Sequence, residues 1–278
     1  MKKVISVILV AAALSALLSA CGNQSEQTQK PDLMSQFTIE TQEMTKQWYT
    51  ADKSTLIAEY DYSVPHMVPT ADAEETVTTA ASTFNTEVDK YFQGLADSFA
   101  ETSQYAEDQY KYELDAGVVS KGDNWDTHYT DEVSCAWNNV GKLLSVQRGY
   151  SSYAGGAHGF TYMSAWNFDV ENGKFITDVT TLGEDSQKLH DVVADEILRQ
   201  ASEELDPEVF SGYWDDYKTT ISNWNVDYYT WFTPEGMYVS FPAYSLACYA
   251  AGEQQFLISY DVIKPYLSDA GKALLGLK

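Results

Sequence analysis

The sequence predicts an α+β fold in which antiparallel sheet strands carry one long and one shorter helix packed on one side. Apolar residues recur every three or four positions from Glu74 to Glu107 and from Leu189 to Ala201, the spacing of helices that bury one face. Apolar and polar residues alternate in segments between and after these helices, as in strands with one buried face. The two kinds of segment do not alternate regularly, which favours an antiparallel over a parallel sheet.

The long helix is expected from Glu74 to about Glu107. Its buried face would consist of apolar residues three or four positions apart: Val77, Ala81, Phe84, Val88, Tyr91, Leu95 and Phe99. A strand from Leu56 to Val64 precedes it, and we expect Pro65 to end that strand because proline lacks a backbone N–H. Alternation predicts a further strand from Tyr110 to Val118.

A hairpin and the shorter helix are predicted next along the chain. Alternation from Phe160 to Val170 predicts one strand, and Asn172-Gly173 supplies the positive-φ pair of a tight turn. The chain then returns through Phe175-Ile176. The shorter helix is expected to start near Asp185 or Ser186, which would serve as its cap.

The C-terminal part is predicted to return to strands. Two helices are expected here, a third helix from Val209 to Tyr217 and a short closing helix from Val262 to Leu267. The predicted strands are Tyr228 to Phe232, Met237 to Phe241 and Phe256 to Tyr260.

Composition limits the classes of partner. The chain has 278 residues, with 17 Lys and Arg against 41 Asp and Glu, and a formal net charge of −24. No Lys/Arg cluster occurs beyond the first residues, which argues against nucleic acid as a partner. Hydrophobic residues make up 44% of the chain, enough for a packed core. The excess acid either favours a cationic partner or forms a solvated surface with no specific partner.

The first twenty residues have the pattern of an export signal. Lys2 and Lys3 precede an uncharged apolar run from Val4 to Ala20. The following box, Leu18-Ser19-Ala20-Cys21-Gly22, resembles the lipobox of bacterial lipoproteins. The resemblance implies that Cys21 receives a lipid and becomes the first mature residue. We therefore expect a protein anchored through Cys21 to the outer face of the bacterial cytoplasmic membrane.

The domain organisation follows from this signal. Residues 1–20 are expected to be the lipoprotein signal peptide, and residues 21–54 the lipidated Cys, a flexible tether and a poorly defined leading segment. Residues 55–278 are expected to form the α+β domain. This domain is either one unit or two sub-domains, at about 55–175 and 176–278.

Two further cysteines, Cys135 and Cys248, lie in apolar stretches. In an exported chain they either pair as a disulfide or remain two buried thiols, and the sequence does not fix their separation.

No familiar catalytic or metal-binding motif is found. The sequence lacks the nucleophile elbow, phosphate loop, zinc-protease and dinucleotide patterns, and its four histidines are not at metal-ligand spacing. We therefore expect no catalytic residue, no metal and no cofactor. The acidic loop Asp123 to His128 is interpreted as a hydrated loop rather than a calcium site, because it lacks the EF-hand spacing. The aromatic residues between Tyr213 and Trp231 form either a carbohydrate-stacking platform or core contacts.

One glycine-rich segment stands out, Tyr150-Ser151-Ser152-Tyr153-Ala154-Gly155-Gly156-Ala157-His158-Gly159, between two predicted strands. Glycines at this density allow positive φ or a close backbone approach. The segment is either a ligand-binding loop with His158 as a polar contact, or a tight connection whose bend His158 holds. The candidate ligand-binding residues are Tyr150, Tyr153, Gly155, Gly156, His158 and Gly159.

This segment and its hairpin resemble an extracytoplasmic bacterial domain family with a Gly-Gly-Ala-His-Gly signature. The family occurs in the lysozyme-binding anti-sigma-V factor and beside peptidoglycan deacetylase domains. The C-terminal segments Phe232 to Tyr244 and Tyr249 to Tyr260 also resemble it, as does the helix that carries Phe84-Asn85, so that the resemblance covers about Thr55 to Leu267.

The resemblance implies a non-catalytic binding or sensing module of the cell envelope. Its expected ligand is a lysozyme-like protein or a peptidoglycan fragment. The alternative is a cell-wall glycan hydrolase or a deacetylase accessory protein. The lipobox replaces the membrane span of the anti-sigma factor, so the resemblance does not imply signalling to a sigma factor.

Overall fold

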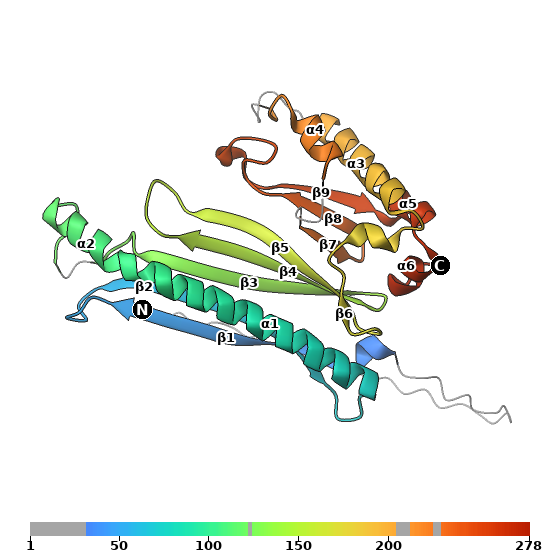
Figure 1. Ribbon diagram of the computed structural model, residues 1–278, viewed down its shortest axis with the longest axis horizontal. Helices are drawn as coiled ribbons and strands as arrows, with labels where there is room; N and C mark the ends of the chain where they lie inside the picture. Colours follow the sequence, from blue (N-terminus) through green and yellow to red (C-terminus); the bar gives the residue numbers. More distant parts are fainter. Residues whose placement is uncertain (1–31, 122–123, 204–211, 225–228) are drawn as a thin grey trace, which may run out of the picture. The chain divides into compact units, whose positions relative to one another are not determined.

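Two sheets and a long helical segment make up the described part of the chain, which comprises residues 32–121, 124–203, 212–224 and 229–278 of the computed structural model (Figure 1). Asp32–Lys278 forms one compact unit. The α+β class predicted from the sequence is confirmed, because strands and helices occur in separate groups along the chain and do not form repeated βαβ units.

The larger sheet has six strands in chain order. They are β1 (Phe37–Tyr49), β2 (Leu56–Pro69), β3 (Tyr129–Val140), β4 (Leu143–Tyr153), β5 (Phe160–Asp169) and β6 (Lys174–Phe175). All neighbours are antiparallel except β2 and β3, which run parallel over Ala58–Tyr62 and Tyr129–Val133. The sheet is therefore mixed, where a purely antiparallel one was expected. A parallel pair needs a long crossover, and the helical segment between β2 and β3 provides it.

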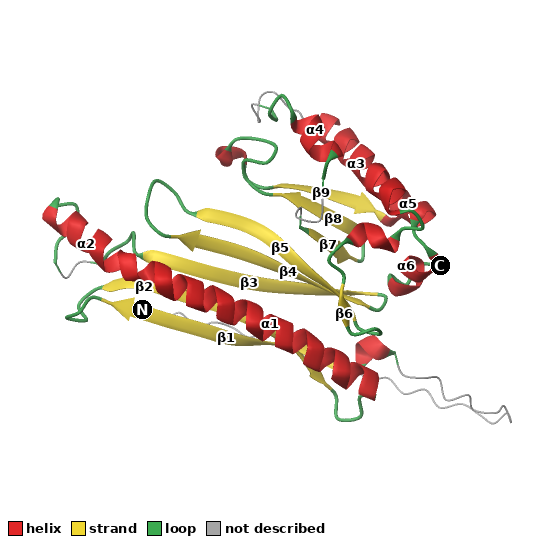
Figure 2. Cartoon of the chain, viewed as in Figure 1, coloured by secondary structure: helices red, strands yellow, loops and turns green. Residues whose placement is uncertain are grey.

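That helical segment runs along one face of the sheet (Figure 2). It consists of α1 (Glu75–Thr102), a 3₁₀ turn η2 (Ser103–Tyr105) and α2 (Ala106–Asp115). The predicted long helix is confirmed, and its buried side chains recur at helical spacing: Val77, Ala80, Ala81, Phe84, Val88, Phe92, Ala96 and Phe99. Phe84 packs edge to face on Phe168 of β5, with ring centroids 5.3 Å apart.

The strand predicted from Tyr110 to Val118 is wrong, because Ala106–Asp115 is helical. Ala106 and Tyr110, four residues apart, are the buried residues of α2, whereas Tyr112 is 69% exposed. The burial therefore has a helical period, and the alternation in the sequence does not reflect a sheet face.

Pro65 does not end β2, which continues to Pro69. The pairing with β3 stops at Tyr62, so Pro65 is paired only with Thr41 of β1. A proline is tolerated on a strand side that has no ladder partner.

The smaller sheet is antiparallel and has the order β7 (Thr230–Thr233), β8 (Gly236–Phe241) and β9 (Gln254–Ser259). Its strands match three predicted segments. The shorter predicted helix is confirmed as α3 (Ser186–Glu203), which packs on β9. The remaining helices are α4 (Tyr217–Ser222), α5 (Tyr260–Ile263) and α6 (Asp269–Leu274), and the remaining 3₁₀ turns are η1 (Leu33–Ser35), η3 (Val179–Leu182), η4 (Tyr249–Ala251) and η5 (Lys264–Tyr266).

The helix predicted from Val209 to Tyr217 falls partly on residues 204–211, outside the described residues. Its described part, residues 212–216, is not helical, and α4 begins at Tyr217.

A buried hydrogen-bond network links β4, β5 and β7. Ser145 Oγ donates to Asn167 Oδ1 at 2.8 Å and accepts from the Phe232 backbone N–H at 2.9 Å. Asn167 Nδ2 donates to the Thr230 carbonyl at 2.6 Å. Buried polar groups that are mutually satisfied in this way fix how β7 meets the larger sheet.

Candidate functional site

The glycine-rich segment forms the end of β4 and the loop Ala154–Gly159 that joins β4 to β5. Gly155 and Gly156 have φ values of +88° and +89°, which side chains other than glycine adopt at a cost. A Cβ atom on Gly159 would lie 2.8 Å from the Ser152 carbonyl oxygen. The glycines are therefore required by the backbone of this loop.

Hydrogen bonds hold the loop on both sides. Tyr153 Oη donates to the Gly156 carbonyl at 3.1 Å, and His158 Nδ1 lies 2.9 Å from the Gly159 carbonyl. The same Gly159 carbonyl accepts from Tyr249 Oη at 2.8 Å. His158 therefore helps to hold the bend, and its side chain is exposed at the same time.

Tyr150 lies away from this loop, within β4. Its Oη donates to Asp131 Oδ1 at 2.5 Å, and Tyr62 Oη donates to Asp131 Oδ2 at 2.5 Å. Asp131 is buried, and burial is the main cause that raises the pKa of Tyr62 and Tyr150. The structure thus separates Tyr150 from the other five candidate ligand-binding residues.

The loop packs against the connection between β8 and β9. The Tyr249 ring stacks on the His158 ring, with the two ring centroids 4.1 Å apart. The centroid of the Tyr244 ring lies 5.5 Å from that of the Tyr249 ring. Glu253 Oε1 in the same connection accepts from the Met163 backbone N–H at 2.9 Å and from Ser240 Oγ at 2.6 Å. Two segments about 90 residues apart in the sequence therefore form one surface.

Trp214 extends this surface from the segment before α4. Its Nε1 donates to the Tyr244 carbonyl at 3.3 Å, and its backbone N–H donates to the Leu246 carbonyl at 2.7 Å. We call His158, Trp214, Tyr244 and Tyr249 the aromatic surface.

The aromatic surface exposes large rings. Trp214 is 44% and Tyr244 57% exposed, and Phe160, which follows the glycine loop, is 51% exposed. Asp215 and Asp216, next to Trp214, are also exposed, so that acidic groups border the rings. Aromatic rings with polar tips and an acidic border can stack on sugars or become buried in a protein interface.

The backbone is strained at this surface. Tyr244 has φ +71°, a conformation that costs a bulky residue energy. Ser245 N–H donates to the Pro242 carbonyl at 3.0 Å, and this turn with the two Trp214 hydrogen bonds holds Tyr244 in place. The Tyr244 ring is exposed on this turn.

Most other aromatic residues of the 213–231 segment serve the core. Trp224 is 1% and Trp231 2% exposed, and Trp224 Nε1 donates to the His190 carbonyl at 3.0 Å. These two tryptophans therefore make core contacts, whereas Trp214 lies at the surface. The sequence contains no signal that pairs Trp214, Tyr244 and Tyr249 with the glycine loop.

The remaining sequence-predicted positions are distributed elsewhere. Cys135 in β3 and Cys248 before η4 are both free thiols in the structure, and burial raises the pKa of Cys135 to about 12. Cys21 lies outside the described residues, as does Asp123 of the acidic loop. Trp125 of that loop is buried and donates from Nε1 to Glu113 at 2.7 Å.

The residues that the structure describes contain no group of three His, Cys, Asp or Glu side chains placed to hold a metal ion. Within the same residues, every helix is too short or too polar to span a bilayer.

The comparisons with known proteins match the C-terminal part to a family. Residues 178–261 match the model of DUF3298, described as a protein of unknown function. This part of the chain, which includes α3 and the smaller sheet, is therefore similar to the DUF3298 family. No curated protein gives a significant sequence match.

Two solved structures share the fold. One is a DUF3298 family member from Bacteroides fragilis, with a TM-score of 0.61 and 13% identity over 86% of this chain and 96% of that chain. The other is a DUF3298 family protein from Pseudomonas aeruginosa, with a TM-score of 0.55 and 12% identity over 86% of this chain and 98% of that chain. At these identities the likeness is one of fold.

Proposed function

We propose that this protein is a cell-envelope lipoprotein whose α+β domain binds a lysozyme-like protein or a peptidoglycan fragment without catalysing a reaction. Cys21 would anchor it to the outer face of the bacterial cytoplasmic membrane. The binding site would be the aromatic surface around the glycine loop.

The observation that carries this proposal is the exposure of the aromatic surface. Trp214 is 44% and Tyr244 57% exposed, and Tyr244 has a positive φ. Tyr and Trp contribute most of the binding energy in many protein interfaces, and their rings also stack on sugar faces. The hydrogen bonds of Trp214 and Tyr249 hold the backbone of this surface, whereas the exposed ring faces remain accessible to a ligand.

The charge of the chain supports a cationic protein as ligand. With a formal net charge of −24, the chain attracts basic proteins, and complementary charge accelerates association. Lysozymes are usually strongly basic. The acidic residues Asp215 and Asp216 beside Trp214 place part of this charge at the proposed site.

The binding site is tested by alanine variants in a calorimetric titration with hen-type lysozyme and with muropeptides. Trp214→Ala and Tyr244→Ala each remove one exposed ring, and we expect about tenfold weaker binding from each, since an interface ring contributes about 1–2 kcal/mol or more. Tyr112→Ala removes a ring that is 69% exposed on α2 and serves as the matched control. Equal affinity of all three variants for both ligands would remove the aromatic surface as the site.

The anchor is tested separately by metabolic labelling with palmitate in a bacterial host. We expect the wild-type chain to incorporate label and to fractionate with membranes, whereas Cys21→Ser incorporates none. Cys248→Ser is the control, because it changes a thiol of the folded domain and should leave labelling unchanged. Labelling of the Cys21→Ser variant would contradict the anchor.

A further inference from the structure

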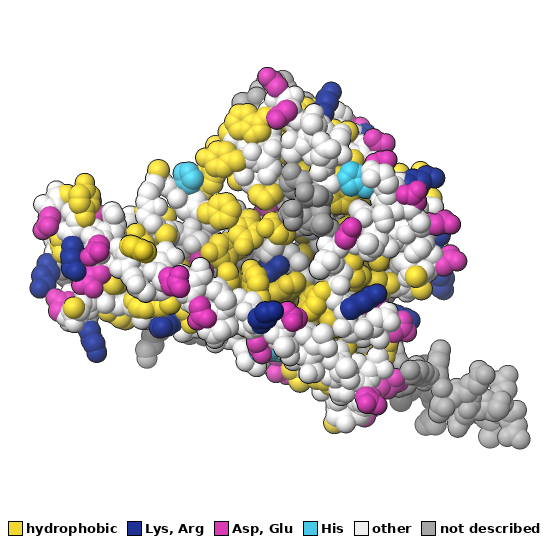
Figure 3. Space-filling view, viewed as in Figure 1, with side chains coloured by type: hydrophobic (Ala, Val, Ile, Leu, Met, Phe, Trp, Pro, Cys, Tyr) yellow, Lys and Arg dark blue, Asp and Glu magenta, His cyan; other side chains and the backbone are white. Residues whose placement is uncertain are grey.

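A cavity of about 740 Å³ lies between α1, β5 and the start of β7. On the face shown in Figure 3, hydrophobic side chains gather in a hollow between α1 and the part that carries α3 and the smaller sheet. The cavity is lined mainly by aromatic and aliphatic side chains: Tyr91, Leu95, Trp166, Phe175, Ile176 and Val179. Its size and apolar lining are those of small-molecule sites.

Arg148 of β4 also lines this cavity and is only 7% exposed. Its guanidinium lies against two rings, with the Cζ atom 4.4 Å from the Tyr91 ring centroid and 3.9 Å from that of Trp166. The two rings are nearly perpendicular to each other, at 83°, with centroids 5.1 Å apart. Both contacts are of the cation–π kind and help to hold the guanidinium at the cavity.

The edges of this guanidinium lack partners among the described residues. Nε and Nη1 are buried and make no hydrogen bond, and Nη2 makes one long bond of 3.4 Å to the Ala165 carbonyl. Any two guanidinium nitrogens that could donate together to one acceptor group include Nε or Nη1. Every such pair therefore contains at least one N–H without a partner among the described residues. A buried cation without a carboxylate is rare in proteins because its desolvation is not offset.

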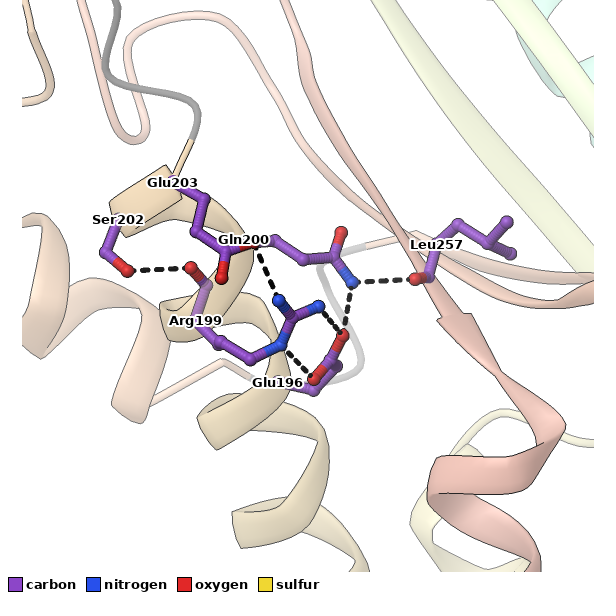
Figure 4. Close-up of polar contacts among 6 residues, drawn as sticks. All are labelled: Glu196, Arg199, Gln200, Ser202, Glu203 and Leu257. Carbon is purple, nitrogen blue, oxygen red and sulfur yellow. Dashed lines mark hydrogen bonds and ion pairs between the residues drawn. The ribbon is translucent and has the colours of Figure 1, made fainter.

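The chain's other arginine shows the usual arrangement. Arg199 on α3 donates to Glu196 through Nε and Nη2 at 2.8 and 2.7 Å, and to Glu203 through Nη1 at 2.7 Å (Figure 4). It does so at an exposed position. Within the part of the chain that the structure describes, Arg148 has no such partner although it is buried.

The charges around the cavity favour an anion. Among the described residues, the titratable groups that act on Arg148 are Tyr91, Cys135, Tyr162 and Tyr229, and none of these four is a carboxyl group. Burial is the main cause that lowers the pKa of Arg148, but an arginine stays charged at neutral pH. At the rim, Lys90 adds a second cation. Its Nζ atom lies 3.8 Å from the carboxylate of Glu87, which also lines the cavity.

We propose that this cavity binds a small carboxylate with an apolar body, such as a medium-length acyl chain. The carboxylate would pair with the guanidinium of Arg148, the buried cation that lines the cavity. The apolar body would lie between Trp166, Phe175 and Leu95. The cavity has no residue in common with the aromatic surface, so either site can fail its test without the other.

The test is a calorimetric titration of the purified chain with octanoate, 1-octanol and acetate. We expect saturable binding of octanoate, at least about tenfold weaker binding of 1-octanol, which lacks the charge, and no saturable binding of acetate, which lacks the chain. Equal binding of octanoate and 1-octanol would overturn the proposed role of Arg148. Absence of octanoate binding would overturn the site.

Variants connect the binding to the cavity. Arg148→Met keeps an unbranched apolar stem and removes the charged guanidinium, and we expect octanoate affinity to fall about tenfold or more. Arg199→Met makes the same change at the exposed, ion-paired arginine and should bind as the wild type does. Unchanged octanoate affinity in Arg148→Met would overturn the proposal.

A second variant leaves Arg148 in place. Gly94 on α1 lines the cavity, and a Cβ atom there would meet nothing within 4 Å. Gly94→Leu should therefore fill part of the cavity, keep the helix and weaken octanoate binding about tenfold or more. Wild-type affinity in this variant would place the ligand elsewhere and overturn the proposal, whether or not Arg148→Met folds.

Discussion

Single residues at the glycine loop have a structural role. Gly155 and Gly156 both have positive φ, and Gly159 approaches the Ser152 carbonyl more closely than a Cβ would allow. His158 lies within hydrogen-bonding distance of the loop backbone and stacks on Tyr249 while remaining exposed. These contacts support the interpretation of the segment as a tight connection, and the binding loop stays a prediction.

Substitution of Gly156 tests the structural part. Gly156→Val places a β-branched side chain at φ +89°, and we expect the free energy of unfolding to fall by about 1–3 kcal/mol. Space is not the cause, because a Cβ atom at Gly156 would meet nothing within 4 Å. Urea unfolding measures the change.

Gly94→Val is the control for this substitution. Gly94 lies within α1 at a φ that side chains tolerate, and it also has open space around it. We expect its free energy of unfolding to stay within about 0.5 kcal/mol of the wild type. Equal free energies of unfolding of the two valine variants would show that the positive φ at Gly156 does not penalise a side chain.

Individual elements show which sequence signals were reliable. Five of the seven apolar positions predicted for the long helix are buried, because a 28-residue amphipathic helix repeats its pattern many times. The other two, Tyr91 and Leu95, are only partly buried and line the cavity. The hairpin predicted at Asn172-Gly173 is confirmed, since β6 pairs with β5 and Gly173 has φ +61°. The expected positive-φ pair is wrong, because Asn172 has no positive φ and residues 170–173 connect the paired Asp169 and Lys174. Both signals are local, so the sequence alone suffices to identify them.

Other elements depend on contacts that no local pattern contains. β1 lies in a segment for which no element was predicted, because most of its side chains are exposed at a sheet edge and its apolar residues are sparse. The parallel pairing of β2 with β3 joins residues about 70 positions apart. The contacts of Tyr249 with His158 and Gly159 likewise join segments about 90 positions apart. The aromatic surface could therefore not be assembled from the sequence.

The side chain of Asn85 joins helix α1 to strand β2. Its Oδ1 accepts from the Met67 backbone N–H at 2.8 Å, and its Nδ2 donates to the Met67 carbonyl at 3.0 Å. Met67 lies in the part of β2 beyond Tyr62, where pairing with β3 has ended. Asn85 therefore replaces the missing strand for both backbone groups of Met67.

Removal of this side chain should destabilise the contact between the two elements. For Asn85→Ala we expect a loss of about 1–3 kcal/mol in the free energy of unfolding, because two partly buried backbone groups lose their partner. Thr86→Ala, at the next and exposed position of α1, should change it by less than about 0.5 kcal/mol. Thermal unfolding, followed by circular dichroism, measures the loss of stability in each variant. Equal losses in the free energy of unfolding for Asn85→Ala and Thr86→Ala would refute this role of Asn85.

For the whole molecule, buried tyrosines set the alkaline limit of stability. Burial is the main cause that raises the pKa of Tyr62, Tyr150, Tyr162 and Tyr260. An unfolded chain ionises tyrosine at about pH 10. Because the folded pKa values lie above that of the unfolded chain, this stabilisation is fully present below pH 10 and is lost as the pH rises above it.

Urea unfolding at pH 8, 9, 10 and 11 measures this dependence. We expect a nearly constant free energy of unfolding up to about pH 9 and a progressive loss above about pH 10. Absorbance of tyrosinate at each pH would show that the buried tyrosines ionise together with unfolding. A free energy of unfolding that stays the same from pH 9 to pH 11 would contradict the burial of these hydroxyl groups.

The measurement that tests the central claim most directly is a binding titration of residues 22–278 with hen-type lysozyme at low and at moderate salt. We predict saturable binding that persists at moderate salt, because contacts of Trp214 and Tyr244 do not depend on screened charges. Binding that disappears with salt would reflect opposite net charges alone and would contradict lysozyme recognition by the aromatic surface.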